Sequence, residues 1–142
     1  MKKKMLLTML GLTCVMGQVY SFSCAYLNFE VINASTNTCK LVNQNLKHGT
    51  FDFFTAAPTY LPPNAGGQII LSQTFYGPEL DLTYSCGDNT EITFTSRQGY
   101  CGFSAGDVSG TIVNAQGMTA DLQTTAGDWW WAQPGTITWH LK

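Results

Sequence analysis

Residues 80–86 are Leu80-Asp81-Leu82-Thr83-Tyr84-Ser85-Cys86, and apolar and polar side chains alternate along them without a break. Successive side chains of a β-strand point to opposite faces, so this period of two predicts a strand with one buried face. The next residues, Gly87-Asp88-Asn89-Thr90, are typical of a turn, and Glu91-Ile92-Thr93-Phe94-Thr95 resumes the alternation. Together these segments predict a β-hairpin.

The same alternation recurs along the chain in both directions, and no window of 11 or more residues shows a helical period. Residues 58–67 contain three prolines and two glycines, which predicts a surface loop. We therefore predict an all-β fold, a single β-sandwich or a distorted barrel, with about eight to ten short antiparallel strands. The other predicted strands lie within residues 27–31, 39–41, 68–72, 100–103, 111–113, 118–122 and 136–141.

The N-terminus has the order of a secretory signal peptide: basic, apolar, then small and polar. Lys2, Lys3 and Lys4 precede an uncharged apolar run over residues 5–16, which is shorter than the roughly 20 residues of a membrane span. We predict a signal peptide of bacterial type over residues 1–23 and a single domain over residues 24–142. Cleavage after residue 21 also fits the pattern, and an uncleaved anchor is the alternative.

Cysteine usage supports export. Cys14 lies in the signal peptide, which leaves Cys24, Cys39, Cys86 and Cys101 in the mature chain. An even number in a small exported domain predicts two disulfides. Neighbouring antiparallel strands start at opposite ends, which favours non-local pairs: Cys24 with Cys86 or Cys101, and Cys39 with the other. A lipid anchor on Cys24 is the alternative for a tethered protein.

The predicted mature chain is acidic. Residues 24–142 contain four Lys and Arg residues and nine Asp and Glu residues, a net charge of −5. Nucleic-acid binding is disfavoured, because phosphate contacts need clustered cations. Attraction to an anionic membrane is disfavoured for the same reason, so any membrane contact would use aromatic side chains or a specific headgroup.

Consecutive tryptophans are the most unusual local feature. If Trp129-Trp130-Trp131 is extended, its side chains alternate between two faces, and at least one indole faces solvent. Tryptophan is favoured at membrane interfaces and binding hot spots, although two of the three could instead belong to the core. More aromatic residues accompany the proline-rich loop. The candidate ligand-binding residues are Trp129, Trp130, Trp131, Phe53, Phe54 and Tyr60.

No catalytic or metal-binding pattern is evident. His48 and His140 have no second ligand at metal-binding spacing, and no Gly-x-Ser-x-Gly sequence is present. We therefore predict no metal and no cofactor. Asn33-Ala34-Ser35 matches a glycosylation acceptor, but the bacterial type of the signal argues against its use.

Several segments in the first half of the mature chain resemble the aegerolysin family of small secreted β-sandwich cytolysins. They are Val31-Ile32-Asn33-Ala34-Ser35, Leu46-Lys47-His48-Gly49-Thr50-Phe51, the prolines of residues 58–63, and Gly66-Gly67. The resemblance implies a β-sandwich that binds membrane lipid and forms pores only with a partner protein.

These observations predict a secreted or periplasmic, non-enzymatic β-sandwich that binds membrane lipid, or alternatively carbohydrate, through exposed aromatic residues. An exported hydrolase with a carboxylate pair and a periplasmic or surface structural protein are the alternatives. The exposure of Trp129, Trp130 and Trp131 distinguishes two of these proteins: the three side chains are buried in the structural protein and exposed in the binding protein.

Overall fold

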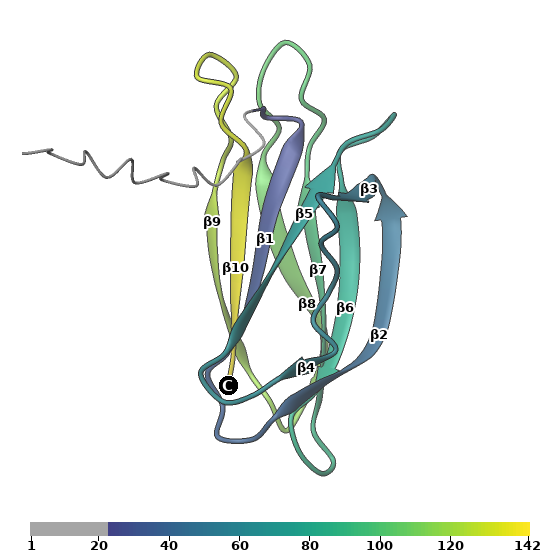
Figure 1. Cartoon of the computed structure of the whole chain (residues 1–142), viewed down its shortest axis with the longest axis vertical. Coiled ribbons are helices and arrows are strands. Elements are labelled where there is room, and N and C mark those ends of the chain that lie inside the picture. Colours follow the sequence, from purple (N-terminus) through teal and green to yellow (C-terminus); the bar gives the residue numbers. More distant parts are fainter. Residues whose placement is uncertain (1–22) are drawn as a thin grey trace, which may run out of the picture.

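The computed structural model describes residues 23–142, so almost all of the predicted signal peptide lies outside the described residues. The described part is built from β-strands, and it contains no helix long and apolar enough to cross a membrane. Figure 1 shows the arrangement of the strands. They are β1 (Tyr26–Asn33), β2 (Cys39–His48), β3 (Thr50–Asp52), β4 (Tyr60–Leu61), β5 (Gly66–Ser72), β6 (Glu79–Ser85), β7 (Glu91–Gln98), β8 (Val108–Gln116), β9 (Ala120–Thr125) and β10 (Gly135–Leu141).

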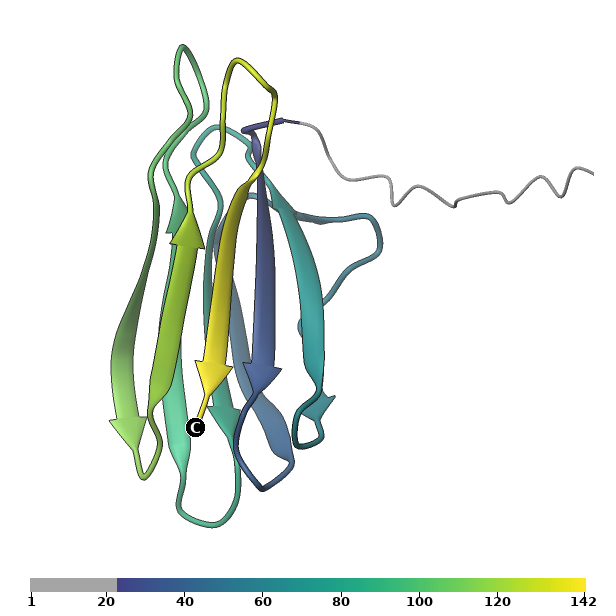
Figure 2. The same ribbon diagram turned by 90° about the vertical axis from the view of Figure 1, so that its left-hand side faces the viewer.

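The strands form two five-stranded sheets, with the orders β3-β5-β1-β10-β9 and β4-β2-β6-β7-β8. The sheets do not close into a barrel, so the prediction of an all-β sandwich with two disulfides is confirmed. One pairing differs from its neighbours: β1 and β10 run parallel, from Leu27 opposite Gly135 to Asn33 opposite Leu141. Figure 2 shows these two strands side by side and pointing in the same direction.

The core consists of the alternating apolar residues that the sequence pattern identifies. Leu80, Leu82 and Tyr84 of β6 are fully buried, and Ile137, Trp139 and Leu141 share the inner face of β10. Burial of such large side chains is the main driving force for folding, at about 1.5–3 kcal/mol for each aliphatic side chain. The ring centroids of Phe94 and Trp139 lie 4.6 Å apart, which brings the two sheets together at the centre.

Tyr84 places a polar group inside this core. Its hydroxyl donates a hydrogen bond of 2.8 Å to the Pro58 carbonyl, and burial raises the pKa of the phenol. Replacing Tyr84 by phenylalanine leaves that carbonyl without its donor, and we expect the free energy of unfolding to fall by about 1 kcal/mol. Urea unfolding measures the change. Tyr60→Phe, at an exposed ring, is the control, and equal stability of the two variants would contradict the role of this hydrogen bond.

The directions of the strands place most connections at one or the other end of the sandwich. The start of β1, the β2–β3 turn, and the β5–β6, β7–β8 and β9–β10 loops lie at one end, which is the upper end in Figure 1. The segment after β3 begins near this end, where the Phe53 ring lies 6.0 Å from that of Tyr26, and then runs to β4 at the opposite end. The β1–β2, β4–β5, β6–β7 and β8–β9 connections lie at the opposite end.

The disulfides join Cys24 to Cys101 and Cys39 to Cys86, with Cα atoms 5.6 Å and 4.0 Å apart. This is one of the two non-local pairings that the sequence left open. The first ties the β7–β8 loop to the start of β1, and the second joins neighbouring strands at the opposite end. Because the Cys24 sulfur is bonded to Cys101, it is not free to carry a lipid. Two disulfides are typical of proteins in an oxidising environment.

Asn33, in the sequence that matches a glycosylation acceptor, is fully buried. Its side-chain nitrogen donates hydrogen bonds to the carbonyls of Leu61 at 2.8 Å and Asn37 at 2.7 Å. Asn33 therefore has a structural role, because it links the β1–β2 turn to β4. The folded chain has no accessible amide there for a glycan.

Candidate functional site: aromatic loops at one end

The three tryptophans occupy a tight turn between β9 and β10. Asp128 and Gln133 exchange backbone hydrogen bonds of 3.0 and 2.9 Å that close the turn. The Asp128 side-chain oxygen Oδ1 accepts a further hydrogen bond of 3.0 Å from the Trp131 amide. The run is therefore a turn and not an extended segment, because capping by the aspartate side chain favours a turn, and the alternation of faces that an extended run would have does not apply.

All three tryptophan side chains are exposed, with 44%, 85% and 77% of the surface of Trp129, Trp130 and Trp131 accessible. The alternative in which two of them belong to the core is wrong. The rings of Trp129 and Trp130 meet edge to face, with centroids 5.1 Å apart, so the two indoles support each other.

Asp128→Ala tests how the turn is held. Loss of the carboxylate removes the acceptor for the Trp131 amide, and we expect hydrogen exchange of that amide to accelerate about tenfold, corresponding to about 1.4 kcal/mol. Amide exchange followed by NMR measures the rate. Asp88→Ala, at an exposed position in a turn of the opposite end, is the control. An unchanged Trp131 rate in Asp128→Ala would show that the backbone pair alone holds the turn.

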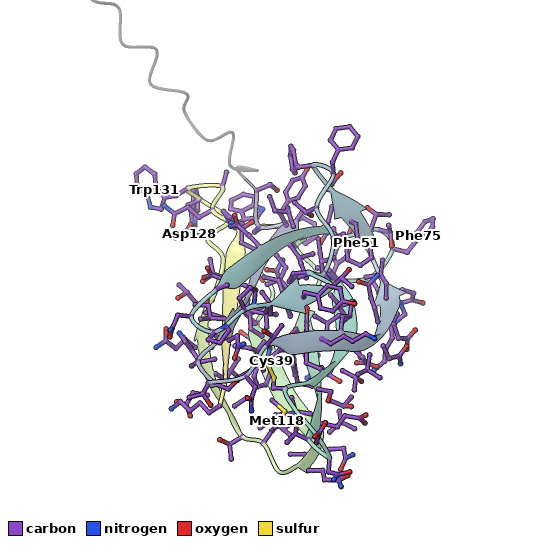
Figure 3. The ribbon with its side chains drawn as sticks, turned by 60° about the horizontal axis from the view of Figure 1, so that its bottom comes forward. Cys39, Phe51, Phe75, Met118, Asp128 and Trp131 are labelled. Carbon is purple, nitrogen blue, oxygen red and sulfur yellow. A yellow bond between two sulfur atoms is a disulfide. The ribbon has the colours of Figure 1, made fainter. Side chains whose placement is uncertain are left out.

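Other loops add aromatic side chains to the same end. The segment after β3 carries Phe53 and Phe54, and the β5–β6 and β7–β8 loops carry two exposed rings each. In Figure 3, the labelled Trp131 and Phe75 lie on two sides of this end. We call this surface the aromatic end. It comprises Phe53, Phe54, Phe75, Tyr76, Tyr100, Phe103, Trp129, Trp130 and Trp131.

The backbone conformation at Phe53 and Phe54 is unusual. Both residues have positive φ values, 53° and 56°. The left-handed region costs a residue other than glycine about 1–2 kcal/mol, and for bulky side chains it is rare. The Phe53 ring lies against Tyr26, with centroids 6.0 Å apart, whereas Phe54 is fully exposed. Exposed aromatic rings held in a strained turn are a feature of binding surfaces.

Cross-links hold the loops of the aromatic end in place. The Gln73 side chain accepts from the Cys101 amide at 2.8 Å and donates to the Cys101 carbonyl at 3.0 Å, and this joins the β5–β6 loop to the β7–β8 loop. The disulfide from Cys101 to Cys24 adds the start of β1. At Gly77 the backbone lies so close to Gln98 that a Cβ atom would meet its carbonyl oxygen at 1.9 Å. The aromatic end is therefore preorganised.

A charged pocket of about 420 Å³ adjoins the aromatic end. Its wall contains His48 and Tyr76, whose rings lie 4.9 Å apart. Arg97 also lines the pocket and donates a hydrogen bond from Nε to Ser109 Oγ at 3.0 Å; within the described residues it forms no salt bridge. Asp107 also lines the pocket and likewise forms no salt bridge in that part of the chain.

Glu79 lines the same pocket but is paired. Lys47 contacts Glu79 at 2.9 Å and Asp81 at 3.0 Å, and the hydrogen bonds to Glu79 and then Asp81 raise the pKa of Lys47. The Lys47 charge is neutralised by these carboxylates, so Arg97 is the cation that this pocket presents to a ligand.

Five of the six candidate residues lie at the aromatic end, and Tyr60 does not. Tyr60 is exposed, but it belongs to β4 and pairs with Lys40 near the opposite end. Four aromatic residues of the β5–β6 and β7–β8 loops were not among the candidates. A signal for them was present, because Gly77-Pro78 and Gly99 mark the loops beside which they occur.

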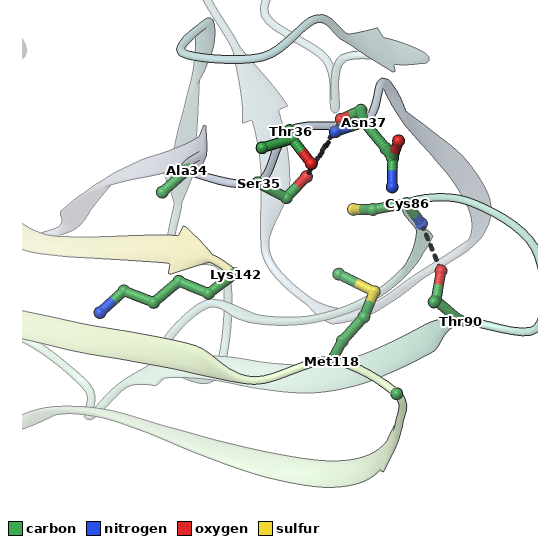
Figure 4. A pocket seen from close by; sticks show the side chains of 9 residues that line it. Ala34, Ser35, Thr36, Asn37, Cys86, Thr90, Met118 and Lys142 are labelled. Atoms are coloured by element: carbon green, nitrogen blue, oxygen red, sulfur yellow. Dashed lines mark hydrogen bonds between the residues drawn. The ribbon is translucent and has the colours of Figure 1, made fainter.

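A second pocket of about 420 Å³ lies at the opposite end, where Figure 4 shows the β1–β2 turn facing Met118. Its polar groups hold turns: the Asn37 amide donates to Ser35 Oγ at 3.3 Å, and the Cys86 amide donates to Thr90 Oγ1 at 3.0 Å. These hydroxyls have structural partners. Nowhere in residues 23–142 do three or more His, Cys, Asp or Glu side chains gather in a way that could hold a metal ion.

The two-sheet β-sandwich is similar in fold to several solved structures. The lipid binding protein Nakanori superimposes with a TM-score of 0.66 at 10% identity, over 83% of this chain and 71% of Nakanori. The RahU protein, solved with a TRIS molecule, gives 0.61 at 14% identity, over 83% and 94%. IP-1A from Alcaligenes faecalis gives 0.50 at 12% identity, over 84% and 92%. No family model matches the sequence, and no curated protein matches it. The similarity shows the fold.

Proposed function

We propose that this protein is a secreted, non-enzymatic β-sandwich that binds membrane lipid through its aromatic end. The observation that carries the proposal is the gathering of nine exposed aromatic side chains on neighbouring loops at one end of the described sandwich. Large exposed aromatic patches mark interaction sites, and Trp and Tyr are favoured where an apolar phase meets water. The similar fold of the lipid binding protein Nakanori supports the lipid as ligand.

The charges around the aromatic end favour a neutral or zwitterionic membrane. Asp107 and Asp128 lie in two of its loops, and the Lys47 charge is taken up by Glu79 and Asp81. Binding therefore rests on burial of aromatic surface, which salt screens little, and not on attraction to anionic lipid.

The pocket beside the aromatic end is the proposed site for the lipid headgroup. Arg97 suits a phosphate group, because its guanidinium offers several donors. His48, Tyr76 and Asp107 suit a cationic group on the same ligand, through a ring face and a carboxylate. By its resemblance to aegerolysins, membrane binding would serve a cytolytic or host-contact role together with a partner protein.

Sedimentation with vesicles tests the proposal. The panel contains phosphatidylcholine, phosphatidylcholine with cholesterol, sphingomyelin with cholesterol, and phosphatidylethanolamine with phosphatidylglycerol. We expect the protein to sediment with at least one neutral composition, and to do so equally in low and high salt. A protein that stays in solution with every composition, or that is released by moderate salt, would contradict the proposal.

The hydrolase alternative has one observation in its favour, since Glu79 and Asp107 line one pocket. Glycoside hydrolysis uses such a carboxylate pair. Here Glu79 is held in an ion pair with Lys47, which gives it a structural partner in place of a substrate. Hydrolysis of aryl glycosides by the protein, abolished in Asp107→Asn, would favour the enzyme over the lipid-binding protein.

A further inference from the structure

A polar groove of about 320 Å³ lies on the outer face of the β3-β5-β1-β10-β9 sheet. Strands β5, β1 and β10 supply its walls, and Figure 2 shows these strands side by side. Every residue that lines it has a polar side chain. They are Asn28, Glu30, Gln68, Thr136 and Thr138.

The sheet register arranges these side chains in two rows. Glu30 of β1 lies between Gln68 of β5 and Thr138 of β10, so a carboxylate is flanked by an amide and a hydroxyl. In the next row Asn28 lies beside Thr136. The rows combine donors and acceptors on rigid central strands, where side chains are positioned more accurately than on loops.

The groups in the groove exclude several classes of ligand. No lysine or arginine lines it, and the Glu30 carboxylate repels anions. No apolar side chain lines it, so an acyl chain or an apolar peptide finds no matching surface. A single carboxylate is also a poor site for a divalent metal, which prefers several oxygen ligands. A neutral ligand rich in hydroxyl groups matches the amides, hydroxyls and carboxylate that remain.

Two of the groove residues have unused hydrogen-bonding capacity. Glu30 forms no salt bridge within the described residues, and the Asn28 side-chain oxygen, which is buried at the base of the groove, has no hydrogen-bond partner there. On the same face, one alternation before Asn28, lies Tyr26, with the Phe53 ring 6.0 Å away. An aromatic ring beside a row of polar groups offers a stacking surface for the apolar face of a sugar ring.

We propose that this groove is a carbohydrate-binding site that takes a neutral sugar. Glu30 accepts hydrogen bonds from two sugar hydroxyls, and Gln68 and Thr138 bond the neighbouring hydroxyls. In a longer oligosaccharide the next ring reaches Tyr26. The five residues that line the groove are not members of the aromatic end, although Tyr26 lies against Phe53, and sugar binding in the groove does not depend on lipid binding.

NMR titration of the full chain tests the site, with glucose, galactose, mannose, N-acetylglucosamine and the trisaccharide of N-acetylglucosamine as probes at millimolar concentrations. We expect at least one probe to shift the side-chain amide signals of Asn28 and Gln68. Thr138→Val removes one hydroxyl with little change of shape, and should weaken binding about fivefold. Glu30→Gln replaces charge-assisted bonds by neutral ones, and should weaken it about tenfold.

Two variants serve as controls for the location. Thr111→Val removes an exposed hydroxyl on β8, and Trp130→Ser alters the aromatic end; both should leave sugar binding unchanged. The proposal is overturned if no probe shifts Asn28 or Gln68, if Thr138→Val and Glu30→Gln bind as well as the parent, or if Trp130→Ser abolishes binding. Vesicle binding of Glu30→Gln should match that of the parent, which separates a failure here from a failure of the lipid proposal.

Discussion

Replacing Trp130 and Trp131 together by serine should weaken binding about a thousandfold, measured with a vesicle composition that binds the parent protein. Each indole buries up to about 200 Å² when removed from water, and half of that area contributes about 2 kcal/mol. Two indoles therefore contribute about 4 kcal/mol, and every 1.4 kcal/mol is tenfold in affinity. The side chains are exposed in a loop turn, so the fold should be unaffected.

The matched control is Tyr60→Ser, which removes an exposed aromatic ring near the opposite end. It should bind vesicles as the parent does. Titration of vesicles into the protein measures both variants. Equal loss of binding in the tryptophan and Tyr60 variants would mean that general hydrophobicity, and not the aromatic end, carries the interaction.

Removing either disulfide should produce the largest loss of stability. In the chain-entropy model, a loop of 77 residues closed by Cys24–Cys101 contributes about 4.5 kcal/mol, and a loop of 47 residues closed by Cys39–Cys86 contributes about 4 kcal/mol. A domain is stable by about 5–15 kcal/mol in total, so loss of both disulfides should unfold much of the protein. Urea unfolding of the paired Cys→Ala variants measures each contribution.

The two disulfides should differ in their effect on lipid binding. Cys24–Cys101 holds the β7–β8 loop, which carries Tyr100 and Phe103, whereas Cys39–Cys86 lies at the opposite end. Under conditions where both variants are folded, loss of the first bond should weaken vesicle binding, and loss of the second should leave it unchanged. Similar binding by both variants would contradict a preorganised aromatic end.

Most of the fold could be predicted because the strands are amphipathic. The alternation in residues 80–86 became β6, with Leu80, Leu82 and Tyr84 in the core. The parallel pairing of β1 with β10 could not be predicted in this way, because periodicity indicates which face of a strand is buried and contains no information about its neighbour. That pairing joins the first and last strands of the domain, which are separated by more than a hundred residues in the sequence.

The sequence indicated most of the residue types of the candidate site, but only part of their arrangement in space. The Trp129–Trp131 run indicated an aromatic surface, but its turn depends on the hydrogen bond that Asp128 accepts from Trp131. Tyr60 follows Phe53 and Phe54 closely in sequence, yet the chain between them runs to the opposite end of the sandwich. Phe75 and Phe103 join the site only because strand direction brings their loops to one end.

Quenching of tryptophan fluorescence by lipids brominated in their acyl chains tests membrane contact most directly. Trp139 is 1% exposed inside the core, so it reports no lipid contact, and a variant with the three loop tryptophans replaced by serine isolates its signal. With vesicles that bind the protein, we predict strong quenching of the parent and none of that variant. Fluorescence of the parent that stays unquenched by bound brominated vesicles would contradict insertion of the aromatic end.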